Sequence, residues 1–223
     1  MKVSIIIPYN KDRGYLSEAI ESAERQDNFT LNEDYEIIVQ QGDWMLSKNF
    51  NDGFKKAKGE YIKILAEDDR LASGCLHYLY EKAKEADYDV VCADAMNFDL
   101  DGTNTMVYKS RIPKSVHHLA LENTLHGGTL LYKATALRAI SALTDQPFNE
   151  RMWTAEEYEV SLRLAEAGCR FAYTPEVVYY YRLHGEQKSG VYWQTDQETK
   201  LYRFEYIEKL QNQFWGNYTQ VAR

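Results

Sequence analysis

Three consecutive acidic residues follow a largely apolar segment that is typical of a buried β-strand. The apolar segment is residues 62–66 (IKILA), and the acids are Glu67, Asp68 and Asp69. Open α/β sheets bind ligands at the carboxyl ends of their strands, and Mg²⁺ and Mn²⁺ prefer carboxylate oxygens as ligands. An isolated acidic triplet is also typical of a solvated turn. The triplet therefore predicts either a divalent-cation site or an acidic surface turn, and the surrounding elements bear on that choice.

Residues 1–98 alternate strand and helix patterns, which is the arrangement of βαβ units and a mostly parallel sheet. The expected strands are residues 2–7, 35–39, 61–65 and 88–93, and the expected helices are residues 14–26, 47–59 and 76–83. Ser47 is predicted to cap the second of these helices and Gly59 to end it. The sequence contains neither G-x-G-x-x-G nor G-x-x-x-x-G-K-[ST], so a dinucleotide-binding fold and a P-loop NTPase have no motif support.

From Asp99 onward the pattern is less regular and suggests a mixed architecture. Gly127-Gly128 precedes an apolar segment at residues 129–132, and residues 177–182 form another expected strand. Thr154 is predicted to cap a helix that Gly168 ends. That helix would carry Glu156 and Glu157 in its first turn, where the helix dipole favours negative charge. The tail from about residue 195 has apolar residues at helical spacing, and we expect it to dock on the domain.

The composition predicts a packed globular protein with no nucleic-acid surface. The chain has 223 residues, of which 44% are hydrophobic, and a net charge of -8, whereas a nucleic-acid surface would be basic. Cys75, Cys92 and Cys169 lie far apart, which suggests neither a zinc site nor a disulfide framework. No apolar stretch approaches the roughly 20 residues of a membrane span, and the start does not resemble a signal peptide. We expect a cytoplasmic protein without a membrane span, and peripheral membrane association stays open.

Several segments resemble the inverting glycosyltransferases of family 2, which have the GT-A fold and use nucleotide-diphosphate sugars. In chain order these segments are Val3–Asn10, Asn51–Ile62, Glu67–Asp69, Gly127–Thr129, Phe148–Leu164 and Tyr181–His184. The resemblance covers about residues 3–190. It implies one α/β GT-A domain over residues 1–223. A Rossmann-like nucleotide-sugar-binding half with a mostly parallel sheet (1–98) would merge with a smaller mixed acceptor-binding half (99–190), followed by a helical tail (191–223).

The resemblance also implies roles for individual residues. Asp69 would bind Mn²⁺ or Mg²⁺, with His184 as a further metal ligand, and Asp68 would contact the ribose or the metal. Glu157 would be the catalytic base. The residues expected to bind the donor are Pro8, Tyr9, Asn10, Gln40, Gln41, Lys48, Asn51, Glu67, Asp68, Gly128, Trp153 and Glu156.

Some positions depart from the family pattern. Gln40 and Gln41 stand where an acidic pair usually reads the base, and an amide can pair with uracil or with thymine. A UDP-sugar is the expected donor. Phe50 replaces a usual arginine, so Lys48 would supply charge for the phosphates, although a solvated lysine has the same pattern.

Other site candidates have plainer explanations. Glu156 and Glu157 could serve only to stabilise the helix dipole, and His184 could be an ordinary loop residue. We interpret His126 as structural.

The expected activity is transfer of a sugar from a nucleotide-diphosphate sugar to a hydroxyl of a saccharide or glycoconjugate acceptor. Transfer would invert the anomeric centre and depend on metal, as in a hexosyltransferase of polysaccharide or glycoconjugate synthesis. One alternative is a sugar-nucleotide-binding or scaffold domain that has lost catalysis. A metal-dependent nucleotidyltransferase is less favoured, because residues 10–14 contain a single glycine where such enzymes have a glycine-rich basic loop.

Overall fold

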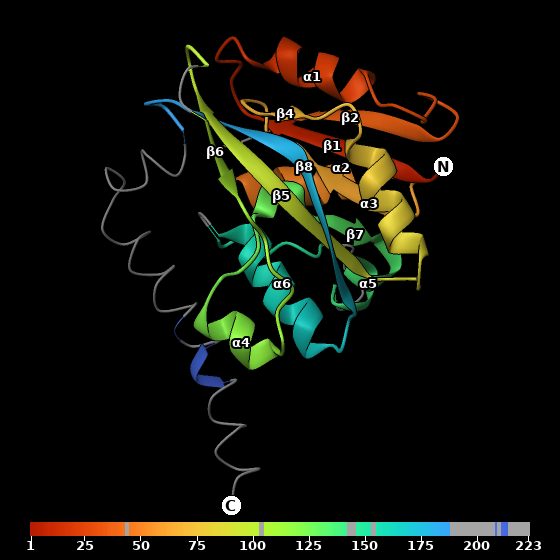
Figure 1. Cartoon of the computed structure of the whole chain (residues 1–223), viewed down its shortest axis with the longest axis vertical. Helices are drawn as coiled ribbons and strands as arrows, with labels where there is room; N and C mark the ends of the chain where they lie inside the picture. Colours follow the sequence, from red (N-terminus) through yellow and green to blue (C-terminus); the bar gives the residue numbers. More distant parts are fainter. Residues whose placement is uncertain are drawn as a thin grey trace, which may run out of the picture.

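A computed structural model gives the fold of the chain (Figure 1). It describes residues 1–42, 45–102, 105–141, 146–152, 155–187, 208 and 211–213. Within these ranges one eight-stranded sheet has the order β2-β1-β3-β7-β5-β8-β4, and β6 pairs with β5. The sheet therefore joins the two halves of the chain into one layer.

The first half supplies the parallel part of the sheet. Its elements are β1 (Val3–Tyr9), α1 (Leu16–Glu24), β2 (Tyr35–Gln41), α2 (Leu46–Phe54), β3 (Tyr61–Ile64), β4 (Arg70–Leu71) and α3 (Cys75–Lys84). Strand β1 lies between β2 and β3 and is parallel to both, with Ile5 opposite Ile37 and Lys63. The three strands end at the same edge of the sheet, so the residues that follow each strand are brought together there.

The second half adds antiparallel pairings. Its elements are β5 (Val90–Asp99), β6 (Thr105–Tyr108), α4 (Val116–Leu121), the 3₁₀ turn η1 (Gly127–Thr129), β7 (Leu131–Lys133), α5 (Ala134–Ala139), α6 (Glu156–Glu166) and β8 (Phe171–Leu183). Strand β7 lies between β3 and β5 and is antiparallel to both, whereas β8 is parallel to β5. The sheet is thus parallel from β2 through β1 to β3 and mixed from β7 onward, and the strand expected at residues 88–93 is β5, in the mixed part.

Helices cover both faces of the sheet, as α/β folds require. Apolar residues of α1 and α3 pack on one face, and those of α2, α4, α5 and α6 pack on the other (Figure 1). The inner strands β1 and β3 are buried on both faces, which explains why their sequences are largely apolar. Strand β1, for example, has six buried residues out of seven.

Three of the predicted helix boundaries need correction. Helix α2 begins at Leu46 after Met45, so Ser47 lies within the helix, where its hydroxyl donates to the carbonyl of Met152 at 3.5 Å. The helix ends at Phe54, before Gly59. Gly59 instead lies against β1, where a Cβ would be 2.3 Å from the amide nitrogen of Ser4. The N-cap position of helix α6 is Ala155, which has a left-handed conformation, and the predicted cap Thr154 lies outside the described residues.

Other predicted features are confirmed, or lie mostly outside the described ranges. Gly168 follows the end of α6 with φ +77, the left-handed conformation that ends many helices. Of the predicted C-terminal helix, only residues 208 and 211–213 are described, and Gln211 donates to the carbonyl of Ala120 in α4. Among the described helices, none has the length and apolar composition needed to cross a bilayer.

Candidate active site

The acidic triplet lies in a tight loop between β3 and β4. The amide of Asp69 donates to the carbonyl of Ala66 at 3.2 Å, which closes the turn. Strand β4 then pairs with β8, with Arg70 opposite Tyr180. This short pairing holds the acidic loop against the end of β8, so the loop meets His184 although the two are far apart in the sequence.

A cavity of about 700 Å³ opens beside this loop. The loop that follows β1 lines it with Tyr9, Asn10, Lys11 and Arg13, and α2 contributes Leu46, Asn49 and Phe50. The acidic loop contributes Ala66 to Asp69, and the second half contributes β6, the 126–128 turn, the start of α6 and the end of β8. The volume falls within the roughly 300–1,000 Å³ of small-molecule sites.

Asp69 uses both of its carboxylate oxygens within the protein. Its Oδ2 accepts a hydrogen bond from the Tyr179 hydroxyl, and its Oδ1 accepts one from the backbone N–H of Arg182, each at 2.7 Å. Only 2% of the residue is exposed. Burial, together with the charge of Asp68, raises the pKa of Asp69 well above its usual value. These contacts fix the acidic loop to β8, and both carboxylate oxygens of Asp69 are directed at protein donors.

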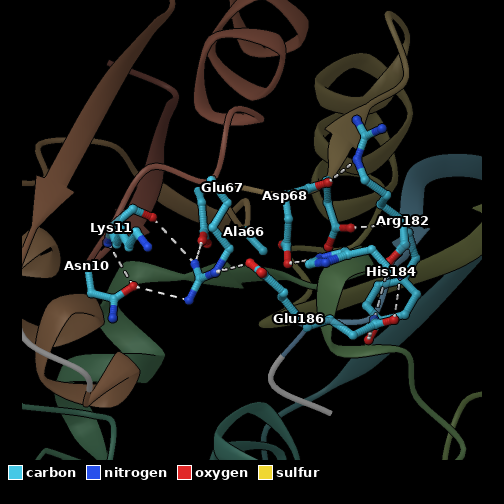
Figure 2. A network of polar contacts seen from close by, with 12 residues as sticks. Asn10, Lys11, Ala66, Glu67, Asp68, Arg182, His184 and Glu186 are labelled. Carbon is cyan, nitrogen blue, oxygen red and sulfur yellow. Dashed lines mark hydrogen bonds and ion pairs between the residues drawn. The ribbon is translucent and has the colours of Figure 1, made fainter. Parts of the chain in front are cut away.

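Asp68 faces His184 across the cavity edge. Its Oδ2 lies 3.0 Å from Nε2 of His184, and its backbone carbonyl accepts a hydrogen bond from Nε of Arg182 at 2.7 Å. Figure 2 shows the Asp68 carboxylate and the His184 ring turned toward each other. Arg182 is held in turn by Glu18 of α1. A carboxylate and an imidazole are thus brought together by elements from both ends of the described chain.

Glu67 forms an ion pair with Arg13 in the loop that follows β1. The same guanidinium lies 4.0 Å from the carboxylate of Glu186, which extends from the loop after β8 (Figure 2). Burial and the neighbouring Asp68 raise the pKa of Glu67 to about 7. Arg13 is therefore a cation on the cavity wall that bridges two acidic loops. Sequence reasoning had assigned it no role.

Glu157 and Glu156 lie in the first turn of α6 and line the cavity. Glu157 packs against the 126–128 turn, where a Cβ on Gly127 would be 3.1 Å from its side chain. The left-handed conformation of Ala155, with φ +63, sets the direction in which the helix leaves the loop. The predicted base is thus brought to the same cavity as the acidic loop.

The other predicted donor residues divide into two groups. Tyr9, Asn10 and Gly128 line the cavity, whereas Pro8, Gln40, Gln41, Lys48 and Asn51 are not part of its lining. Trp153 lies outside the described residues.

Three residues outside the cavity lining carry side-chain amides, namely Gln40, Gln41 and Asn51. The amide of Gln40 donates to the carbonyl of Gln41 at 2.7 Å and accepts from Lys56 at 2.6 Å. Asn51 is buried and binds both backbone groups of Phe148. Gln41 itself is exposed at the end of β2.

Lys48 forms an ion pair with Asp52 at 2.8 Å, one helical turn along α2. Arg13 is thus the better-placed cation for an anionic ligand of the cavity.

Sequence reasoning also missed an aromatic wall, which we define as Tyr108, His126 and Tyr181. All three line the cavity, and the ring centroid of His126 lies 5.3 Å from that of Tyr108 and 5.4 Å from that of Tyr181. Burial lowers the pKa of His126 to about 4, so its ring is neutral at pH 7. The sequence feature that pointed to His126 as a site residue was its position directly before Gly127-Gly128. No sequence feature pointed to Tyr108, because its place in the cavity depends on the pairing of β6 with β5.

The donor set at the acidic loop fits a divalent cation shared with a ligand. Among the described side chains, no group of three or more His, Cys, Asp or Glu residues could hold a metal ion. Asp68 and His184 still offer one oxygen and one nitrogen 3.0 Å apart. Mg²⁺ is commonly bound by one or two protein ligands together with substrate phosphates and water. This pair therefore suits a cation that binds with an anionic ligand.

One stretch of the chain matches a known protein family. Residues 31–138 match the family described as Glycosyl transferase family 2. This match covers slightly less than half of the chain and supports the resemblance to family 2. The glycosyltransferase GlyG of Streptococcus pneumoniae serotype 4 (strain ATCC BAA-334 / TIGR4) is 24% identical over 175 residues, which are 66% of this chain and 58% of that protein.

Solved structures show that the chain has the GT-A fold. S. aureus TarS residues 1–349 in complex with UDP-GlcNAc superposes with a TM-score of 0.64 at 17% identity, covering 85% of this chain and 61% of that one. The same fragment in complex with UDP gives a TM-score of 0.61 at 16% identity, covering 83% of this chain and 62% of that one. The chain thus spans less than two thirds of the length of these proteins. The predicted fold is confirmed, and the match to residues 31–138 supports the predicted family.

Proposed function

We propose that the protein transfers a sugar from a UDP-sugar to a hydroxyl acceptor, with inversion and with a divalent cation. The observation that carries this proposal is that the acidic loop, Arg13 and Glu157 line one cavity. TarS, which shares the fold, has been solved with UDP and with UDP-GlcNAc. A nucleotide-sugar donor is consistent with a cavity that has cations and acids side by side.

Asp68 and His184 would hold Mn²⁺ or Mg²⁺, in place of the Asp69 assignment suggested by sequence. Asp69 would instead hold the loop in position through Tyr179 and Arg182. When bound, such a cation neutralises charge on a departing diphosphate. Arg13 would contact the same diphosphate, exchanging part of its pairing with Glu67 and Glu186 for phosphate oxygens.

Glu157 would act as the general base. Its carboxylate takes the proton from the acceptor hydroxyl as that oxygen forms a bond to the anomeric carbon. The bond from the anomeric carbon to the diphosphate oxygen breaks at the same time, and UDP leaves with the electron pair. A single in-line displacement of this kind inverts the anomeric centre.

The aromatic wall would bind the acceptor. Tyr108, His126 and Tyr181 present a neutral imidazole and two phenol rings, and Lys11 and Arg13 are the described Lys and Arg residues that line the cavity. Flat aromatic surfaces suit the apolar faces of sugar rings. The wall therefore favours a saccharide or glycoconjugate acceptor over one recognised by its phosphate, and synthesis of a polysaccharide or glycoconjugate is the natural setting.

Calorimetry with UDP and UDP-GlcNAc, in Mn²⁺ and then in EDTA, tests the donor site. We expect wild type to bind UDP in Mn²⁺, and Asp68→Asn to lose the metal-dependent part of that binding. Asp52→Asn is the matched control, because Asp52 pairs with Lys48 and Lys55 on α2, outside the cavity lining. Binding that is unchanged in Asp68→Asn would remove that residue from the metal site. Failure of wild type to bind either nucleotide would contradict a UDP-sugar donor.

A further inference from the structure

Lys63 is a lysine inside the sheet. It lies on β3, between Ile5 of β1 and Leu131 of β7, and its exposed fraction is 0%. Moving an ammonium group from water into a protein interior is strongly unfavourable unless hydrogen bonds and opposite charges compensate. An apolar residue would fill this strand position without that penalty, so the contacts of the ammonium group call for an explanation.

The Lys63 ammonium binds the 126–128 turn beside the cavity. Its Nζ donates to the carbonyl of Ile64 at 2.9 Å and to the carbonyl of Gly128. It also lies over the ring of Tyr179, 5.0 Å from the centroid. An ammonium group has three donors, and two of them are thus directed at backbone carbonyls of residues that line the cavity.

The turn itself is pressed between two side chains of the candidate active site. A Cβ on Gly128 would be 2.5 Å from the Tyr179 ring, and a Cβ on Gly127 would be 3.1 Å from Glu157. A Cβ at Gly128 would therefore require the Tyr179 ring to shift, whereas one at Gly127 would require the Glu157 side chain to give way by a few tenths of an ångström. The turn thus packs closely against both side chains.

Tyr179 extends this contact to the acidic loop. Its hydroxyl donates to Asp69 at 2.7 Å and accepts from the amide of Ala66 at 3.2 Å. A continuous path therefore runs from Glu157 through the glycine turn and Tyr179 to the loop that carries Asp68. The Lys63 ammonium contacts two members of this path, Gly128 and Tyr179.

We propose that Lys63 is a positioning residue, whose ammonium group holds the Gly128 carbonyl and so fixes the separation of Glu157 from the acidic loop. The catalytic part of this inference rests on the proposed role of Glu157, whereas the structural part rests on contacts alone. Lys63 does not line the cavity and so acts through the turn.

The charges around Lys63 support this role. Burial lowers the pKa of Lys63 to about 8, so the group is still protonated at pH 7. The titratable groups that interact with it are Glu157, Asp69, Cys75 and His126. The nearby ammonium favours the ionised carboxylate of Glu157, which is the form that a general base needs.

Two substitutions separate the contact from the charge. Lys63→Met keeps the aliphatic chain but removes both the hydrogen bonds and the charge, whereas Lys63→Gln keeps an N–H donor without the charge. Lys133→Met is the matched control, since Lys133 is on the neighbouring strand β7 and pairs with Asp87 outside the cavity lining. UDP release from UDP-GlcNAc in Mn²⁺ gives kcat, and calorimetry with UDP gives donor affinity.

We expect Lys63→Met to lower kcat about tenfold or more, since displacement of a reacting group by 1 Å can cost about 10² in rate, while UDP affinity changes little. Lys63→Gln should recover part of kcat. In both variants the acid limb of the kcat–pH profile should move to higher pH, because a carboxyl group without its neighbouring cation ionises less readily. Lys133→Met should change neither kcat nor the profile. Wild-type kcat and profile in Lys63→Met would overturn the proposal.

Hydrogen exchange tests the contact without reference to activity. The amides of Thr129 and Leu130 close the turn by donating to His126 and Gly127, and these amides should exchange faster in Lys63→Met than in Lys133→Met. Unchanged exchange at the turn would overturn the positioning role even if activity fell. If wild type bound no nucleotide, the proposed function would fail, whereas faster exchange at the turn would still support the structural part.

Discussion

The cavity has two walls of different chemistry. The wall from the first half carries Lys11 and Arg13 beside Glu67 and Asp68, and its charged side chains are paired across loops. The other wall is the aromatic wall of Tyr108, His126 and Tyr181, in which His126 is neutral at pH 7.

The difference shows how a cavity can orient a substrate that is anionic at one end. In the proposed function a diphosphate would find cations on the first wall only, so the sugar would point away from that wall, toward Glu157 and the acceptor. The acids beside Arg13 keep that guanidinium in place before a ligand arrives, which reduces the reorganisation needed on binding. Separate substitutions on each wall should therefore have separate effects on donor binding, chemistry and acceptor binding.

Glu157→Gln is expected to have the largest effect, because it removes chemistry without altering either wall. Positioned acid–base catalysis contributes about 10²–10⁴ in rate, so kcat for transfer should fall by that factor while UDP affinity stays near wild type. Steady-state kinetics with calorimetry measures both. Glu166→Gln, on an exposed position of the same helix, is the control. A kcat within a factor of about two of wild type would remove Glu157 from the role of base.

The same division explains what could be predicted from the sequence. In the first half, alternating strands and helices are parallel and locally specified, so hydrophobic periodicity indicated every strand from β1 to β3 and the position of the acidic loop. In the second half, β7 enters between β3 and β5, and β6 pairs with β5. Those pairings join distant segments, and no local pattern specifies them.

Individual site residues also depend on long-range contacts that the local sequence does not specify. Sequence alone could not separate Asp68 from Asp69, because adjacent carboxylates differ only through partners on β8 and in the loop after it, which lie far away in the chain. The buried Lys63 resembled an ordinary strand residue, and His126 resembled a core histidine. Arg13 had no assigned role, since its partners Glu67 and Glu186 come from two other loops.

Glu67→Gln, on the charged wall, should change the stability of the protein relative to wild type by an amount that depends on pH. The pKa of Glu67 is about 7 in the folded protein, against an ordinary value of 4.5, mainly because of burial. The folded state therefore holds this proton more tightly, so wild type loses stability as pH rises from 4.5 to 7, whereas the glutamine has no proton to lose. The stability of Glu67→Gln relative to wild type should increase by at most about 1.4 kcal/mol per pH unit. Denaturant unfolding at pH 5, 6, 7 and 8 measures the difference, and a difference that shrinks with pH would contradict a raised pKa.

Tyr181→Leu should have the smallest effect and should act on the aromatic wall alone. Leucine keeps apolar bulk but removes the flat ring, and aromatic contacts are worth about 0.5–1.5 kcal/mol beyond the area that they bury. The KM for methyl glycoside acceptors should therefore rise about two- to tenfold, with UDP affinity unchanged. Tyr181→Phe keeps the ring and should stay near wild type, although it loses the hydrogen bond from Gln187 at 2.8 Å.

Tyr78→Leu is the control for that substitution, since Tyr78 is an exposed tyrosine of α3 outside the cavity lining. Equal KM values for Tyr181→Leu and Tyr78→Leu would show that the aromatic wall does not bind the acceptor. A loss of UDP affinity in Tyr181→Leu would show instead that the donor reaches this wall. Either result would end the assignment of the two walls to two substrates, because that assignment requires the ring to act on acceptor binding and on nothing else.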